Sequence, residues 1–136
     1  MMSYTMTQKI LFKHCDPAGI VFYPRYFEMI NDCTEAFFDT SLGHPFETLH
    51  QNGGVPTARI NTVFKAPSRH GDILQIELRS TRLGRSSLDL RFEGRCGQEI
   101  RFEAESTLVY VGREGRPQNW PTPLRNALET DIKGNN

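Results

Sequence analysis

Residues 24–39 read PRYFEMINDCTEAFFD, and this stretch decides the fold of the chain. Apolar side chains recur in it at steps of three and four, and charged side chains occupy the opposite face with the same spacing. Pro24 suits a first helical position, and Gly43 provides a stop beyond the last turn. The sequence therefore predicts one long amphipathic helix of about fifteen residues, whose apolar face needs a surface to lie on.

A strand is predicted on the upstream side of this helix. Residues 4–13 alternate apolar and polar side chains, which is the period of two of a half-buried strand. The alternation ends at Asp16-Pro17-Ala18-Gly19, where proline fixes φ and glycine tolerates positive φ. We expect the chain to turn there, about eight residues before the helix begins.

Downstream of Val55 the pattern changes to strands. A period of two recurs in four segments, 58–64, 74–78, 88–92 and 100–110. The breaks between them are short and turn-like, so consecutive strands are expected to be antiparallel hairpin neighbours. Residues 44–51 predict a short helical turn before Gly53 and Gly54.

One helix and five strands predict an α+β domain in which an antiparallel sheet wraps around the helix. Residues 1–115 form this domain, and residues 116–136 are expected to form a tail with a helix over 121–131 and a frayed end at 134–136. Such a sheet leaves edge strands and one partly apolar face. We therefore expect a second copy of the chain to cover them.

Composition excludes several classes of protein. Sixteen Lys and Arg balance sixteen Asp and Glu, so no global field attracts nucleic acid or an anionic membrane. No apolar run approaches the length of a membrane span, and the first residues lack the order of a signal peptide, so a cytoplasmic location is expected. The three cysteines, Cys15, Cys33 and Cys96, form no C-x-x-C pair and are expected to be free thiols.

Asp16 is the first candidate for chemistry, because it lies in an exposed loop between two rigid elements. Aspartate before proline also commonly hydrogen-bonds the backbone of its own turn, so the alternative is that Asp16 only stabilises the turn. The start of the helix near Tyr23 offers unpaired backbone N–H groups that can polarise a carbonyl.

The run from His14 to Tyr26, HCDPAGIVFYPRY, resembles the signature of the hotdog-fold acyl-CoA thioesterases of the 4-hydroxybenzoyl-CoA thioesterase type. A carboxylate, a Pro-Ala-Gly turn, an aromatic pair and a proline that opens a long helix agree in order and spacing. The strand pattern after Val55 also fits, so the resemblance covers residues 4 to about 112. It implies a hotdog fold, in which the five-stranded sheet wraps around the long helix.

The resemblance implies hydrolysis of a coenzyme A thioester to a free acid and a thiol. Asp16 aligns with the family's catalytic aspartate, which acts as nucleophile or as general base for water. Tyr23 aligns with the residue whose backbone N–H faces the thioester oxygen. Gly19 permits the tight loop that brings Asp16 into the site.

Substrate-binding residues follow from the same resemblance. Arg85 and Ser86 align with the turn that binds the nucleotide of coenzyme A. Arg82, close by in the sequence, is a second basic residue that can contact the phosphates. The alternative is that these arginines are solvated and pair with acidic residues on neighbouring strands. Asn31 replaces an aspartate that faces the substrate hydroxyl in the hydroxybenzoyl branch, and Phe22 belongs to a candidate pocket for a ring. The acyl group that the resemblance implies is aromatic or of short to medium length.

The implied enzyme uses no metal or redox cofactor, since coenzyme A belongs to the substrate, and works as a dimer or a homotetramer with sites between subunits. A non-catalytic module that binds acyl-CoA or an acyl carrier protein is the alternative from another class. A hotdog hydratase requires a histidine paired with an acid, which this loop lacks. Other candidates have weaker patterns: the adjacent pair His14 and Cys15, the scattered His44, His50 and His70, the helix carboxylates Glu28 and Glu35, and Trp120.

Overall fold

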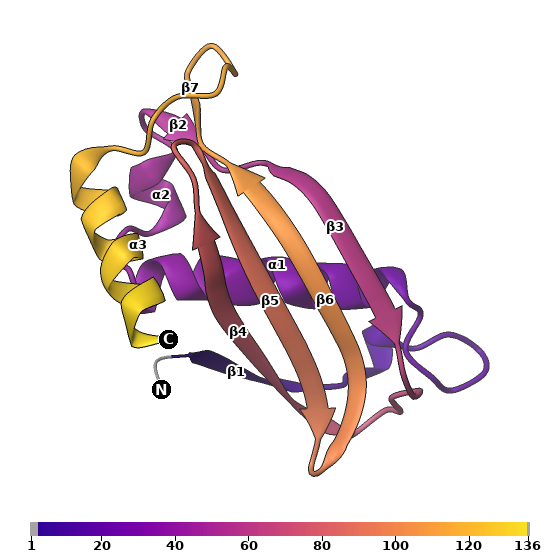
Figure 1. Cartoon of the computed structure of the whole chain (residues 1–136). Coiled ribbons are helices and arrows are strands. Elements are labelled where there is room, and N and C mark those ends of the chain that lie inside the picture. The colour runs from indigo at the N-terminus through magenta and orange to yellow at the C-terminus, as the bar shows by residue number, and fades with distance from the viewer. Residues whose placement is uncertain (1–2, 136) are drawn as a thin grey trace.

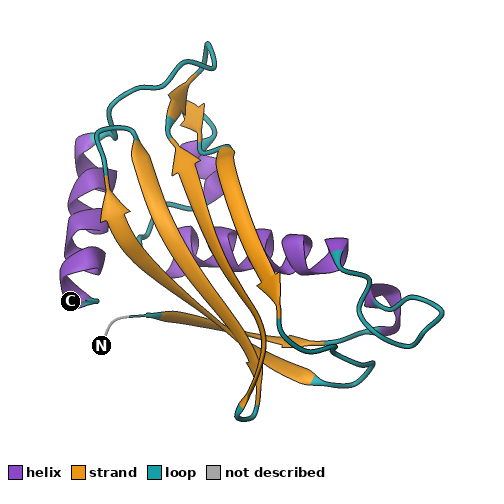
Figure 2. Cartoon of the chain, turned by 45° about the vertical axis from the view of Figure 1, so that its right-hand side comes forward, coloured by secondary structure: helices purple, strands orange, loops and turns teal. Residues whose placement is uncertain are grey.

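The long helix lies across one face of a five-stranded antiparallel sheet (Figures 1 and 2). The computed structural model describes residues 3–135. The helix, α1, spans Pro24–Thr40 and begins at the predicted proline. The strands of the sheet, in spatial order, are β1 (Tyr4–Lys9), β4 (Ile73–Leu83), β5 (Ser87–Cys96), β6 (Glu99–Val109) and β3 (Thr57–Phe64). The predicted α+β class and the wrapping of the sheet around one helix are confirmed.

Short elements complete the chain. A 3-10 turn, η1 (Phe12–His14), follows β1, and a single helical turn, α2 (Phe46–Leu49), follows α1 as the sequence predicts. A two-stranded ladder pairs β2 (Gly53–Gly54) with β7 (Val111–Gly112). The tail forms a third helix, α3 (Thr122–Gly134).

The pairing of β3 differs from the expectation that consecutive strands are neighbours. Strands β4, β5 and β6 do form successive hairpins, but β3 pairs with β6 and not with β4. The reason is that both edges of β4 are occupied, one by β1 and the other by β5. The free edge of β6 is therefore where β3 adds, and β3 becomes an edge strand of the sheet.

The core lies between the apolar face of α1 and the inner face of the sheet. Met29, Cys33 and Phe37 of α1 are almost completely buried. They meet alternate residues of the strands: Leu74, Ile76, Leu78, Leu88, Leu90, Phe92 and Phe102. The apolar stripe of the helix thus covers the face that the alternation in the strands predicts.

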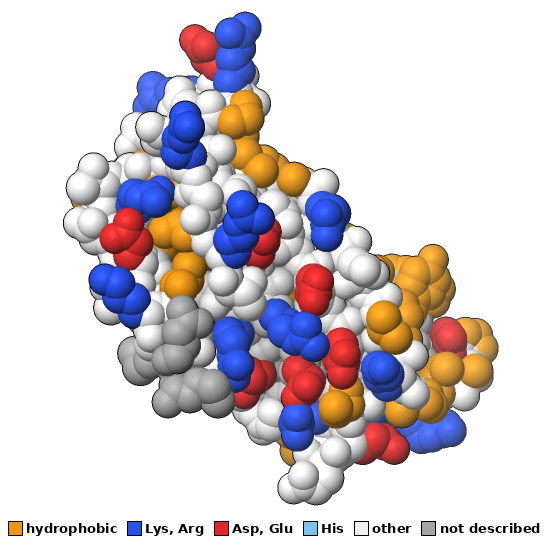
Figure 3. Space-filling model, viewed as in Figure 1, with side chains coloured by type: hydrophobic (Ala, Val, Ile, Leu, Met, Phe, Trp, Pro, Cys, Tyr) orange, Lys and Arg blue, Asp and Glu red, His pale blue; other side chains and the backbone are white. Residues whose placement is uncertain are grey.

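The outer face of the sheet is charged, contrary to the expectation of a partly apolar face. Arg91 on β5 pairs across the ladder with Glu105 on β6 at 2.9 Å, and Figure 3 shows positive and negative side chains side by side over these strands. Exposed apolar side chains gather instead near the end of β3 and on the loop before α1. Cross-strand pairing explains the difference, because it places charges of opposite sign next to each other.

The first strand is shorter than predicted. It ends at Lys9, although the alternation in the sequence extends to Lys13. The imidazole Nδ1 of His14 accepts a hydrogen bond from the backbone N–H of Leu11 at 2.8 Å, and this contact closes η1. A local side-chain cap therefore replaces the last part of the predicted strand.

The helix α3 packs along the second half of β4 on the same side of the sheet as α1, where it buries Leu124 and Leu128. We expected residues 134–136 to fray. Gly134 is the last residue of α3, and the Asn135 amide donates to the carbonyl of Ser80 at 3.1 Å; Asn136 lies outside the described residues. None of the helices between residues 3 and 135 is both long and apolar enough to cross a membrane.

Candidate active site

Asp16 lies in the tight turn between η1 and α1. Its backbone N–H donates to Ile20 O, and its carbonyl accepts from the N–H of Gly19, both at 2.9 Å. Gly19 has φ of +81°, which explains why glycine is needed in this turn. The Ala18 N–H donates to Asp16 Oδ1 at 2.9 Å, whereas Oδ2 accepts no hydrogen bond from any of residues 3–135. One carboxylate oxygen is thus fixed by the turn and the other is available for chemistry.

The rest of the molecule fixes both sides of this loop. On one side the Val21 N–H donates to the carbonyl of Ser68, and on the other the Phe22 N–H donates to the carbonyl of His14, both at 2.9 Å. His14 is buried, and burial together with the nearby charges of Lys13 and Arg25 lowers the pKa of its imidazole. A neutral imidazole is what the hydrogen bond from Leu11 requires, because only an unprotonated Nδ1 accepts.

Tyr23 occupies the position just before α1. Its backbone has φ of −52° and ψ of −33°, and Pro24 takes the first helical position, as predicted. The Tyr23 N–H has no acceptor among the described residues, so it is an unpaired donor at the positive end of the helix dipole. Its phenol ring is exposed and makes no hydrogen bond within residues 3–135. The sequence thus places a carboxylate and a free backbone donor on one short loop.

An aromatic cluster connects this loop to β3. The ring of Tyr23 lies 5.7 Å from that of Phe22 and 6.0 Å from that of Phe64, and Phe64 also contacts Phe27 at 6.3 Å. Phe22 and Phe64 are about half exposed. The cluster is therefore an apolar surface that extends from Asp16's loop to the first turn of α1.

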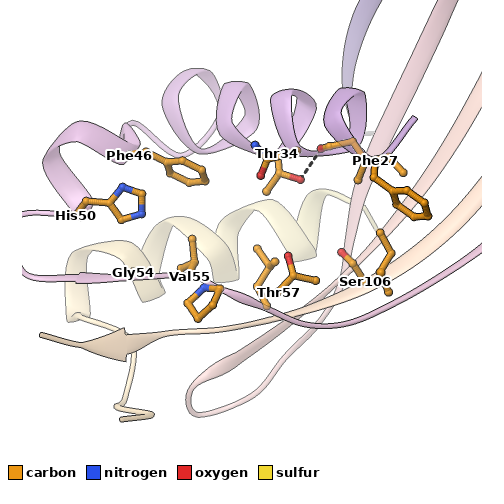
Figure 4. Close-up of a pocket in the computed structure, with 13 residues that line it drawn as sticks. Phe27, Thr34, Phe46, His50, Gly54, Val55, Thr57 and Ser106 are labelled. Carbon is orange, nitrogen blue, oxygen red and sulfur yellow. Dashed lines mark hydrogen bonds between the residues drawn. The ribbon is translucent and has the colours of Figure 1, made fainter. Parts of the chain in front are cut away.

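A larger cavity of about 660 Å³ begins at Phe27 and runs along α1 toward α2 (Figure 4). Thr34, Phe46 and His50 lie on its helix side, and Val55, Thr57 and Ser106 on its strand side. Of the predicted substrate-binding residues, Asn31 lines this cavity and Phe22 does not. A mostly apolar cavity of this size with a few polar groups suits a small organic ligand.

The predicted phosphate-binding arginines differ from the other arginines of strands β4 to β6 in their ion pairs. Arg79 lies 3.5 Å from Glu77, Arg91 2.9 Å from Glu105 and Arg101 2.7 Å from Asp72, and Arg95 pairs with Glu93. Arg82 and Arg85 are exposed, and within residues 3–135 neither has an acidic partner. The proposed pairing of these two arginines with neighbouring carboxylates is therefore not found.

The turn that carries Arg85 and Ser86 is held by the tail. The indole Nε1 of Trp120 donates to Ser87 O at 3.2 Å, and its backbone N–H donates to Arg85 O at 3.1 Å. Arg125 on α3 donates to the Gly84 carbonyl at 3.2 Å. Trp120, whose role the sequence leaves open, is buried against Tyr110 and supports this turn.

The turn lies far from Asp16 within one chain. The N–H of Ile10, near the start of the loop, donates to Asp72 O beside the first residue of β4, and Arg85 follows the last residue of the same strand. An eleven-residue strand at roughly 3.3 Å per residue separates the two ends by about 35 Å. One chain does not bring Asp16 and Arg85 together.

The competing candidates are dispersed. Among residues 3–135 no three metal-ligating side chains form a cluster. Glu28 and Glu35 are exposed on the polar face of α1. Burial raises the pKa of the Cys33 thiol to about 12, so this thiol stays protonated at neutral pH, and the three cysteines are free thiols.

Sequence reasoning missed the cavity residues Thr34, Phe46, His50 and Ser106. A signal was present for one of them. The buried face of β6 reads Phe102, Ala104, Ser106 and Leu108, so a serine stands at a core position where the alternation predicts an apolar residue.

The comparisons with known proteins agree on one family. The family model described as thioesterase-like superfamily matches residues 10–128. A 4-hydroxybenzoyl-CoA thioesterase of Pseudomonas sp. (strain CBS-3) is 35% identical over 78 residues, which are 55% of this chain and 55% of that protein. The chain therefore matches about half the length of this curated relative.

Solved structures share the whole fold. A gentisyl-coenzyme A thioesterase is 25% identical, with 91% of this chain and 98% of that chain covered and a TM-score of 0.84. A 1,4-dihydroxy-2-naphthoyl-CoA thioesterase from Synechocystis is 18% identical, with 96% and 98% covered and a TM-score of 0.86. The second likeness concerns the fold alone.

Proposed function

The chain belongs to the thioesterase-like superfamily, and on this basis we propose that it hydrolyses acyl-coenzyme A thioesters to the free acid and coenzyme A. The observation that carries the proposal is the loop between η1 and α1. It presents an oxygen of Asp16 without a protein donor, and the unpaired N–H of Tyr23 lies at the start of the helix that follows.

Asp16 acts on the thioester in one of two ways. As a nucleophile, its oxygen attacks the carbonyl carbon, the C–S bond breaks, and water then cleaves the resulting anhydride to release the acid. As a general base, it takes a proton from a water molecule that attacks the same carbon, and the proton passes to the departing thiolate. In both cases the carbonyl oxygen becomes negative, and the Tyr23 N–H donates to it.

The remaining predicted residues bind substrate. Arg82 and Arg85, which have no acidic partner within residues 3–135, bind the phosphates of coenzyme A together with Ser86, and Asn31 contacts the acyl group in the cavity along α1. Gly19 keeps the Asp16 turn tight, and Phe22 covers the apolar surface beside it. The acyl group is an aromatic one or a chain of short to medium length. The relatives named for 4-hydroxybenzoyl-CoA and gentisyl-coenzyme A support the aromatic choice.

We further propose that the working enzyme is a dimer, or a dimer of dimers, in the cytoplasm. One edge of β3 has no partner among the described strands, and its residues Ile60, Val63 and Phe64 expose large apolar side chains. Pairing with a second copy covers both the unpaired strand edge and the exposed apolar side chains. It also offers a way to join Asp16 and Arg85 in one site, because within one chain these residues lie near opposite ends of β4.

The test is thiol release from benzoyl-, 4-hydroxybenzoyl-, phenylacetyl- and straight-chain acyl-CoA. Wild type is expected to turn over at least one class, and Asp16→Asn to lose at least a hundredfold in kcat, since it removes the charge of the carboxylate. Asp39→Asn is the matched control, because Asp39 is exposed in the last turns of α1. Release by Asp16→Asn at the wild-type rate would remove Asp16 from the mechanism. No release from any thioester by the folded protein would favour a module that only binds acyl-CoA.

A further inference from the structure

A serine whose hydroxyl has no partner among residues 3–135 lies in the wall of the cavity along α1. Ser106 on β6 is 6% exposed and lines the cavity on its strand side (Figure 4). Its Oγ has no hydrogen-bond partner within residues 3–135, and it is not among the enclosed polar atoms that lack one, so the oxygen is accessible to a molecule from outside. Because the oxygen is accessible and Ser106 lines the cavity, a group that enters the cavity can hydrogen-bond it.

The other buried serines show that this is not the usual state of a serine in this protein. Ser68 accepts a hydrogen bond from the guanidinium of Arg101 at 3.1 Å. Ser80 donates to the carboxylate of Asp131 and accepts from the Asn135 amide. Among the buried serines, Ser106 is thus the one whose hydroxyl faces a cavity instead of a described polar group.

The surroundings of Ser106 leave room for a ligand, and the described side chains next to it do not hydrogen-bond its hydroxyl. Its neighbours on the inner face of β6 are the small Ala104 and the apolar Leu108. Across the cavity, the hydroxyl of Thr34 already donates to the Ile30 carbonyl at 2.9 Å. The Ser106 hydroxyl is therefore free to donate to, or accept from, a group that enters the cavity.

We propose that Ser106 determines specificity by hydrogen-bonding an oxygen substituent on the body of the acyl group, so that oxygen-bearing acyl groups are preferred over their plain hydrocarbon counterparts. The proposal rests on the thioesterase function proposed above. A hydroxyl on an aromatic ring and a hydroxyl on an aliphatic chain offer the same chemistry. A site built to hydrogen-bond a substrate hydroxyl discriminates against the analogue that lacks it, because the polar group of the site then stays unpaired.

The experiment compares kcat/KM for two matched pairs of substrates, 4-hydroxybenzoyl-CoA with benzoyl-CoA and 3-hydroxyoctanoyl-CoA with octanoyl-CoA. Ser106→Ala is expected to lower kcat/KM for the hydroxylated member of one pair about five- to tenfold and to leave the plain member unchanged. The pair that responds identifies a ring or a chain as the source of the oxygen. Equal losses on both members, or unchanged ratios in both pairs, would overturn the proposal.

Two further variants separate specificity from stability. Ser80→Ala also removes a buried hydroxyl, but one that contacts α3 outside the cavity, so it is expected to lower the melting temperature and to keep both substrate ratios. Ser106→Cys keeps nearly the volume of serine and replaces the hydroxyl with a weak donor, so it is expected to shift the ratio in the same direction as Ser106→Ala.

Binding of free acids separates a failure of this proposal from a failure of the thioesterase function. 4-Hydroxybenzoate and benzoate, and the corresponding octanoates, are added to wild type and Ser106→Ala, and thermal unfolding is followed. A hydroxy acid that stabilises wild type more than Ser106→Ala, without hydrolysis of any thioester, would support Ser106 as a binding residue and refute the enzyme. Hydrolysis with ratios that Ser106→Ala leaves unchanged would refute the role of Ser106 alone.

Discussion

The guanidinium of Arg101 on β6 lies 2.7 Å from the carboxylate of Asp72, and this contact holds the connection between β3 and β4. The same guanidinium nitrogen donates to Ser68 Oγ at 3.1 Å. The carbonyl of Ser68 in turn accepts from the N–H of Val21, in the loop that carries Asp16. One largely buried arginine thereby connects the sheet to the candidate catalytic loop.

Removal of this arginine is expected to destabilise the fold. Arg101→Met leaves the Asp72 carboxylate without its partner, and we expect the free energy of unfolding to fall by about 2 kcal/mol, since hydrogen bonds to charged groups contribute about that much. Urea unfolding at neutral pH measures the change. Arg91→Met is the matched control, because the Arg91 ion pair is exposed and a loss below about 1 kcal/mol is expected. Equal losses in the two variants would contradict the structural role of Arg101.

The same pair predicts a dependence of stability on pH. The hydrogen bond from Arg101 lowers the pKa of Asp72 below its ordinary value of 3.8. Because the folded state holds this carboxylate in its charged form, the stabilisation is complete above that value and is lost as the pH falls through the lower pKa of the folded state. Asp72→Asn is expected to flatten this loss in unfolding curves measured at acid pH. A wild-type slope in the variant would assign the acid sensitivity to other carboxylates.

Substitutions of Tyr23 distinguish its backbone from its side chain. Tyr23→Phe is expected to keep kcat within about twofold, because the N–H donates and the hydroxyl does not take part. Tyr23→Pro removes the N–H at a φ of −52°, which proline adopts, and is expected to lower kcat by about a hundredfold. Tyr23→Ala, which keeps the N–H and loses the ring, is the control for the proline variant. Equal kcat values for the proline and alanine variants would rule out the backbone donor.

Arg85 is expected to act on the nucleotide part of the substrate. Arg85→Ala should raise KM for an acyl-CoA about tenfold and leave KM for the corresponding acyl-pantetheine unchanged, because the truncated substrate lacks the nucleotide phosphates. Arg113→Ala provides the comparison, since the Arg113 guanidinium already donates to the carbonyl of Gln51 at 2.9 Å. Equal increases in KM on both substrates would exclude a phosphate contact at Arg85.

A charge at the free edge of β3 tests the proposed assembly. Val63 is 51% exposed and faces away from α1, so Val63→Lys is expected to leave the fold intact and to weaken pairing between two copies of this strand. Sedimentation or light scattering should show a dimer in wild type and a shift toward monomer in the variant, with activity falling in parallel. A monomeric wild type with full activity would refute the shared site.

The elements and the catalytic loop follow from the sequence because their signals are local. The spacing in residues 24–39 specifies α1 and its buried face, since side chains three and four apart lie on one side of a helix. The Asp-Pro-Ala-Gly turn specifies the backbone around Asp16, because Gly19 permits the positive φ that the turn needs. Alternation specifies which residues of each strand enter the core.

The tertiary structure alone decided the relations between distant segments. The pairing of β3 with β6 depends on which edges the other strands leave free. The ion pair of Arg91 with Glu105 depends on the register between β5 and β6, whereas Arg85 lies in the turn before β5 and has no acidic partner within residues 3–135. The cavity lies where Ser106 and Leu108 of β6 come close to Ile30 and Thr34 of α1. Such contacts join residues that are far apart in the chain, and their free energy depends on packing of the whole domain, which local periodicity does not encode.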